Sequence, residues 1–68
     1  MEEKNHELKD AIRRSGVPMK LLASWVFVTE KDMKQILEQV LSESDVRELL
    51  WRLYLAHDEM KSNQMNHN

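Results

Sequence analysis

The amino-acid sequence predicts an all-α fold, a compact bundle of about four short helices that forms a single domain over residues 1–61. The chain has one glycine and one proline among its 68 residues, and both residue types interrupt helices. Leu, Glu, Lys, Gln and Met, which favour helix, are common in it. Apolar residues also recur at intervals of three and four along the chain, which is the spacing of one helix face. A chain of this length forms one domain at most.

The first helix is predicted from about His6 to Ser15, and the second from Pro18 to about Val26. Gly16 stands between them, where a left-handed C-terminal cap is expected. Pro18 suits the first position of a helix, where its missing N–H has no cost. The inward stripes consist of Leu8, Ala11, Ile12 and Ser15 in the first helix and of Leu21, Leu22, Trp25 and Val26 in the second.

Two capping signals predict where the third and fourth helices begin. Thr29 and Asp32 have the spacing of a capping box, and Ser42 and Asp45 repeat it. We therefore expect the third helix to start at Thr29 and to continue to Leu41, the last residue of its apolar stripe. That stripe follows the i, i+3, i+4, i+7, i+8 spacing and consists of Met33, Ile36, Leu37, Val40 and Leu41.

The fourth helix is predicted from about Glu43 to Met60 or Lys61. Residues 62–68 are polar and show no periodicity, so we expect them to form a disordered tail. One apolar face of the fourth helix consists of Val46, Leu49, Leu50, Leu53, His57 and Met60.

The composition excludes several classes of site and predicts that the chain is not an enzyme. It contains no cysteine, so it forms neither a disulfide nor a thiolate metal site. Its three histidines lack the helical spacing of metal ligands, and it has no nucleophile motif or phosphate-binding glycine loop. We therefore expect no metal and no cofactor. The sequence shows no signal peptide and no apolar run of membrane-spanning length, which predicts a cytoplasmic protein with no membrane partner.

Charge is distributed unevenly along the chain, although the net charge is only -2. Residues 8–34 contain six basic and three acidic residues, whereas residues 35–68 contain three basic and six acidic ones. The first half is therefore mildly basic and the second acidic. Three acidic–basic pairs at i, i+4 spacing are expected to be solvated surface pairs, and they are Glu30–Lys34, Glu43–Arg47 and Glu48–Arg52.

Residues 19–36 have the pattern of two short helices that cross at a fixed angle. Such a unit needs a small residue where the helices cross, apolar residues near the turn, and a polar outer face on its second helix. The small residue here is Ala23. The apolar positions are Val26, Val28, Met33 and Ile36. In these residues the chain resembles the helix-turn-helix family of phage repressors and related bacterial regulators.

The resemblance implies a small transcriptional regulator that binds duplex DNA. In the family, the outward positions of the second helix of the unit contact DNA, and here they are Thr29, Glu30, Lys31, Lys34, Gln35 and Glu38. We expect Lys34 and Gln35 to contact base edges. The residues expected to contact phosphates are Thr29, Lys31, Lys20 and Arg13.

Phe27 departs from the family pattern, which usually has glycine in the turn. A left-handed backbone at this position would strain a phenylalanine. Two interpretations follow: the turn is built differently from the family's, or the spacing reflects an ordinary helical core.

The fourth helix has a second apolar stripe, formed by Trp51, Tyr54 and Leu55. Exposed aromatic residues often mark interfaces, so we expect a partner to bind this stripe. The simplest partner is a second copy in a symmetric dimer, which would place two DNA-binding units together. The alternative is a protein-interaction module that does not bind DNA, such as an antirepressor or an inhibitor of a larger regulatory protein.

Overall fold

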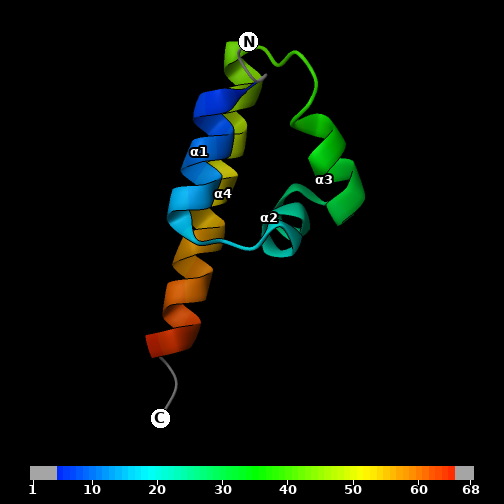
Figure 1. Cartoon of the computed structure of the whole chain (residues 1–68). Helices are drawn as coiled ribbons and strands as arrows, with labels where there is room; N and C mark the ends of the chain where they lie inside the picture. The colour runs from blue at the N-terminus through cyan, green and yellow to red at the C-terminus, as the bar shows by residue number, and fades with distance from the viewer. Residues whose placement is uncertain (1–4, 66–68) are drawn as a thin grey trace.

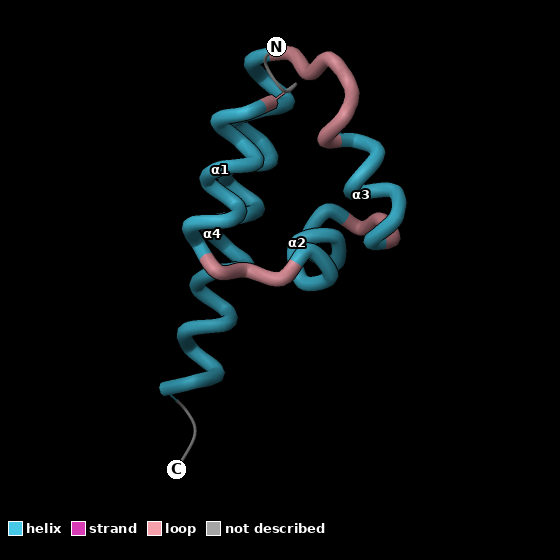
Figure 2. Tube along the Cα trace, viewed as in Figure 1, coloured by secondary structure: helices cyan, strands magenta, loops and turns pink. Residues whose placement is uncertain are grey.

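The computed structural model describes residues 5–65 of the chain, and the side chains of residues 5–62. It contains the helices α1 (His6–Ser15), α2 (Met19–Val26), α3 (Glu30–Ile36) and α4 (Glu43–Met65), with no strand in the described residues (Figure 1, Figure 2). The predicted all-α fold is confirmed. Within this part of the chain, no helix is both long enough and apolar enough to cross a membrane.

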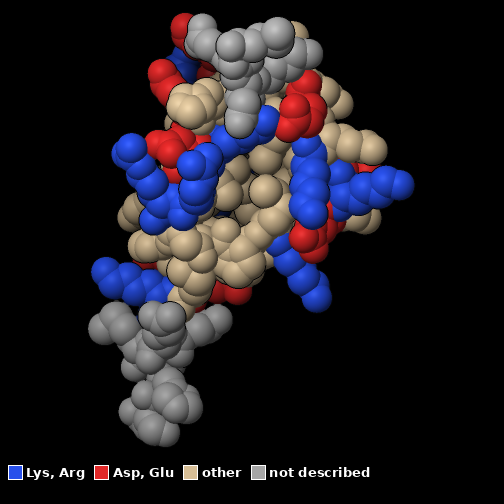
Figure 3. Space-filling model, viewed as in Figure 1, with Lys and Arg blue, Asp and Glu red and all other residues tan. Residues whose placement is uncertain are grey.

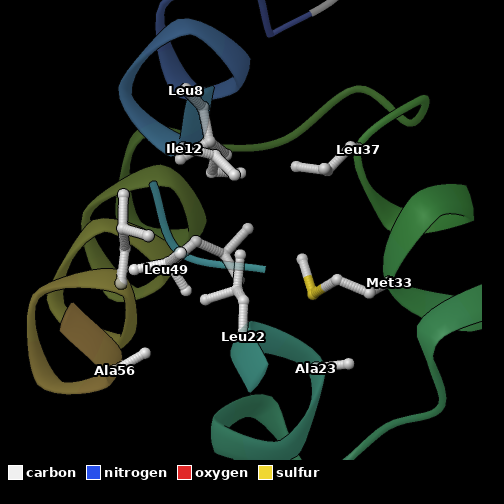
Figure 4. Close-up of a cluster of buried hydrophobic side chains, with 10 residues drawn as sticks. Leu8, Ile12, Leu22, Ala23, Met33, Leu37, Leu49 and Ala56 are labelled. Atoms are coloured by element: carbon white, nitrogen blue, oxygen red, sulfur yellow. The ribbon is translucent and has the colours of Figure 1, made fainter. Parts of the chain in front are cut away.

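α1 and α2 pack on α4, which is 23 residues long, and α3 packs on α2. α1 lies along the first half of α4, and α2 contacts both α4 and α3 (Figure 1). All four helices and the segments beside them contribute to one core. Its buried residues are Leu8, Ile12, Val17, Leu22, Ala23, Met33, Leu37, Leu49, Leu53 and Ala56. Figure 4 shows Met33 of α3 and Leu22 of α2 pointing into the same interior space.

α1 is bounded by two residues with left-handed backbone. Asn5 precedes it with φ 58°, and Gly16 follows it with φ 75°. Glycine and asparagine adopt this conformation at the lowest cost. The Gly16 N–H donates to the Arg13 carbonyl at 3.3 Å, so the predicted glycine cap is confirmed.

α3 is shorter than its apolar spacing predicts. It ends at Ile36, and Val40, which we expected on the inward stripe, is 87% exposed. The reason is a tertiary contact: the Asn5 side-chain amide donates to the carbonyls of Leu37 and Gln39, both at 2.8 Å. Carbonyls at the end of a helix lack intrahelical partners. The Asn5 amide provides a donor for the carbonyls of Leu37 and Gln39, so the helix can end before them.

α4 begins where the capping signal predicts. The Ser42 hydroxyl accepts the Asp45 N–H at 3.1 Å, and the Asp45 carboxylate accepts the Ser42 N–H at 3.4 Å, which is the reciprocal pattern of a capping box. The helix continues to Met65, about one turn beyond the predicted end. The predicted disordered tail, residues 62–68, therefore overlaps α4, and residues 66–68 lie outside the described residues.

Candidate nucleic-acid interface

The chain turns between α2 and α3 at Phe27. This residue has φ 64° and ψ 40°, which is left-handed backbone. The Phe27 N–H donates to the Ser24 carbonyl at 3.2 Å, and the Val28 N–H donates to the Ala23 carbonyl at 3.0 Å. Such bonds close a helix at a left-handed residue, a position that glycine usually occupies. Phe27 therefore has the left-handed backbone that glycine usually provides in the family, so the turn is not built with a different backbone at this residue.

The residues around this turn are buried as the crossing pattern requires. Ala23 is 2% exposed, at the point where α2 meets α3, and Met33 is fully buried. The other apolar positions of the pattern are half-buried against the core, and they are Val26, Val28 and Ile36. An ordinary helical core requires the same burial, so these apolar residues do not distinguish it from a helix-turn-helix unit. The left-handed backbone at Phe27 is the more distinctive feature.

Arg52 of α4 holds the end of α2 in place, a role that the sequence analysis missed. Its guanidinium donates to the Trp25 carbonyl at 3.2 Å and to the Glu48 carboxylate at 2.8 Å. It also lies 5.7 Å from the centre of the Phe27 ring. Beside it, the Trp25 indole N–H donates to Glu59 of α4 at 2.9 Å. The expected i, i+4 pair Glu48–Arg52 forms, with the Glu48 side chain exposed, and Arg52 in addition contacts the end of α2.

The Phe27 ring itself is 82% exposed. It lies at the tight connection that precedes α3, beside the Arg52 guanidinium. The fold thus places a large apolar side chain in water at a backbone position that disfavours it. Backbone strain of this kind concentrates at functional sites.

The outer face of α3 is exposed, and it includes Lys31, Lys34 and Gln35. The Lys34 ammonium lies 3.7 Å from the Glu30 carboxylate. The Thr29 hydroxyl accepts the Asp32 N–H at 3.0 Å, which confirms the predicted N-terminal cap of α3. Because a hydroxyl is both donor and acceptor, Thr29 keeps a proton to donate while it caps the helix.

Basic side chains of α1 and α3 lie on one face of the molecule. Figure 3 shows Lys and Arg over both helices, on either side of an uncharged area. The Lys and Arg residues of these two helices are Lys9, Arg13, Arg14, Lys31 and Lys34, and α2 adds Lys20.

Acidic residues partly neutralise this basic face. The Asp10 carboxylate lies 3.0 Å from Arg14 and 3.7 Å from Arg13. Lys9 contacts Glu38, beyond the end of α3, at 2.6 Å. For Lys20 and Lys31, the described residues provide no ion-pair partner. Of the predicted cationic phosphate contacts, Lys20 and Lys31 therefore have no ion pair in the described part of the chain, whereas Arg13 lies near Asp10.

The second apolar stripe of α4 differs in part from the prediction. Trp51 and Tyr54 are 54% and 60% exposed, and their rings stack with centroids 5.5 Å apart. Leu55, the third residue of the predicted stripe, is half-buried and therefore less accessible than the two aromatic residues. Leu50, which we expected on the core face, is 39% exposed, and it joins the aromatic pair at the surface. Leu50 and Tyr54 also line an open groove of about 340 Å³ between α1 and α4.

Among the described residues, no group of three His, Cys, Asp or Glu side chains is arranged to hold a metal ion. Comparison with models of known protein families, with curated proteins and with solved structures finds no match for this chain.

Proposed function

We propose that this chain is a small transcriptional regulator of helix-turn-helix type that binds duplex DNA through α3. The observation that carries the proposal is the left-handed turn at Phe27. It joins two short helices through three residues, with Ala23 buried where they meet. The outer face of α3 stays polar and exposed, as an element that enters the major groove must be.

Lys34 and Gln35 are the proposed base readers. A glutamine amide pairs with the donor and acceptor of adenine in the major groove, and a lysine ammonium donates to guanine acceptors. The ion pair of Lys34 with Glu30 is exposed at both ends. Such pairs contribute little free energy, so Lys34 exchanges its carboxylate for a base at small cost.

The proposed phosphate contacts are Lys31, Lys20, Arg13 and the hydroxyl of Thr29. They come from α1, α2 and the start of α3, so they would fix the unit on the DNA backbone while α3 reads the groove. Three cationic contacts per unit predict that the logarithm of the binding constant falls with the logarithm of salt concentration at a slope of about -3. A dimer that engages two half-sites would about double this slope.

Fluorescence anisotropy with random-sequence duplex DNA at several salt concentrations tests the proposal. We expect binding that weakens with salt and that is lowered in Lys31→Gln, which removes a proposed phosphate contact on α3. Lys61→Gln on α4 is the matched control, because it removes the same charge from another exposed helical lysine and should bind like the parent. Equal binding by Lys31→Gln and the parent would remove α3 from the interface.

A second candidate function is favoured by the exposed aromatic pair on α4. A protein-interaction module that does not bind DNA, such as an antirepressor or an inhibitor of a larger regulatory protein, would use Trp51 and Tyr54 as anchors. The five acidic and three basic residues of α4 fit this role better than contact with phosphates. It predicts no salt-sensitive DNA binding by the parent, and loss of partner binding in Trp51→Ala.

A further inference from the structure

The face of α4 that points away from the core carries an aromatic surface that the described residues leave largely exposed. Trp51 and Tyr54 are more than half exposed, and their rings are nearly parallel, with 16° between the planes. The opposite face of the same helix, which includes Leu49, Leu53 and Ala56, is buried in the core. Two stacked aromatic rings at the surface of so small a domain form the kind of apolar patch that binds another chain.

The aromatic pair belongs to a longer seam along α4. The seam consists of Arg47, Trp51, Tyr54 and Asp58, at successive spacings of four, three and four residues. Alternating steps of three and four keep side chains on one stripe of a helix, and they are the spacing by which two helices pack along each other. All four side chains are exposed.

The charges of the seam are arranged symmetrically about its aromatic centre. Arg47 lies four residues before Trp51, and Asp58 lies four residues after Tyr54. Reversing the direction of the helix about the midpoint of the aromatic pair therefore exchanges Arg47 with Asp58 and Trp51 with Tyr54. A second copy that runs antiparallel meets each residue with its complement, whereas a parallel copy meets it with itself.

We propose that two copies of this chain form a symmetric antiparallel dimer through α4. In this register, Trp51 packs against Tyr54 of the partner subunit, and Arg47 pairs with Asp58 of the partner subunit. The two-fold axis repeats each contact, so the dimer has two such ion pairs. A parallel arrangement would place arginine against arginine and aspartate against aspartate, which is repulsive.

The present partners of the charged residues leave them free to form these pairs. Arg47 lies 3.5 Å from Glu43, and both side chains are highly exposed. Asp58 has no ion pair within the described residues. The dimer thus gives Asp58 a counter-charge that the described part of its own subunit does not provide. The seam lies opposite the core face of α4, so this inference does not depend on DNA binding by α3.

Charge reversal tests both the dimer and its direction, with mass measured by sedimentation equilibrium over a range of protein concentrations. The parent should be a dimer. Arg47→Glu and Asp58→Arg each make both ion pairs repulsive, so each should raise the dimer dissociation constant by about tenfold or more. The double variant R47E/D58R restores both pairs, and it should dimerise nearly as well as the parent. Lys20→Glu is the control, because it makes the same change in charge on α2 and should not alter the mass.

Further measurements separate this register from non-specific association. An equimolar mixture of the Arg47→Glu and Asp58→Arg chains should form a heterodimer, since both contacts are then attractive. Trp51→Ala should be monomeric, with the helical circular dichroism of the parent. A parent that stays monomeric, or an Arg47→Glu variant that dimerises like the parent, would overturn the proposal. In a parallel dimer, Arg47→Glu would only replace one like-charge contact by another.

Discussion

Replacing Phe27 by glycine and by alanine isolates the backbone strain of the turn between α2 and α3. Both substitutions remove the ring and its contact with Arg52, so their difference reports the backbone at φ 64°. A left-handed residue other than glycine costs about 1–2 kcal/mol. Glycine in turn loses about 0.4–1 kcal/mol more conformational entropy on folding than alanine does. We therefore expect Phe27→Gly to be more stable than Phe27→Ala by about 0.5–1 kcal/mol.

The sign of the stability difference between Phe27→Gly and Phe27→Ala distinguishes a left-handed from a right-handed backbone. In a right-handed helical position, glycine is less stable than alanine by about 0.8–1 kcal/mol, so the two backbones predict opposite orders. Urea denaturation followed by circular dichroism measures both free energies of unfolding. For a domain of this length, 1 kcal/mol corresponds to a shift of about 4–8 °C in Tm. If Phe27→Ala is more stable than Phe27→Gly by about 0.4–1 kcal/mol, the turn is not strained.

Gly16 provides a reverse test at a second left-handed position. Its φ is 75°, and a Cβ added there would meet no atom within 4 Å. Gly16→Ala therefore changes the backbone energy without creating a clash, and it should lose about 0.5–1 kcal/mol of stability. A much larger loss would mean that contacts, and not the backbone, determine the energy at this cap.

Three further substitutions test the contacts that hold the helices together, each by the free energy of unfolding in urea. Arg52→Ala should lose about 1–2 kcal/mol because the Trp25 carbonyl loses a charged donor, whereas Arg47→Ala, on the same helix, should lose less than about 0.5 kcal/mol. Equal losses would remove the special role of Arg52. Asn5→Asp should lose about 1–3 kcal/mol, since a carboxylate would face the two carbonyls that the amide now binds; a neutral result would contradict this account of where α3 ends. Met33→Ala should lose about 2–5 kcal/mol because the side chain is fully buried, and a loss below 1 kcal/mol would place Met33 outside the core.

The boundaries that the sequence predicts well depend on neighbouring residues. Gly16 ends α1, and Ser42 with Asp45 begins α4, within about one residue of the prediction. Caps of this kind are hydrogen bonds between residues two or three positions apart. Their chemistry is therefore visible in a short stretch of sequence, before any tertiary contact is known.

The boundaries and surfaces that the sequence predicts poorly depend on distant residues. α3 ends at Ile36 because Asn5, 32 positions from Leu37, binds the carbonyls after the helix. Leu50 lies at the edge of the core stripe of α4, and helical spacing alone does not decide on which side such an edge residue lies. In both cases the packing of α1 on α4 and on the end of α3 supplies the missing information.

The sequence predicts which residues of the candidate DNA interface are exposed, but it does not predict the contacts that hold α2 and α3 in place. Lys31, Lys34 and Gln35 are exposed on α3 as expected. The cluster that fixes the turn was not visible, because Arg52 has the i, i+4 spacing of an ordinary surface pair with Glu48. Its bond to the Trp25 carbonyl spans 27 positions, and no local pattern indicates it.

α4 connects the two proposals, because its successive residues point to different surfaces. Adjacent residues of a helix differ by about 100° in direction, so Arg52 reaches the end of α2 while Trp51 remains at the surface. A dimer through Trp51 and Tyr54 would therefore set the distance between two α3 helices through the helix that already holds each turn.

If DNA binding requires that distance, Arg47→Glu should weaken DNA binding although Arg47 is not a proposed DNA contact. The double variant R47E/D58R should restore it. If each subunit binds alone, Arg47→Glu should change the mass and leave the salt-dependent affinity per subunit unchanged. Lys31→Gln should do the reverse, lowering DNA affinity without altering the mass. Mass and DNA affinity, measured on the same variants, therefore test the α4 seam and the α3 surface independently.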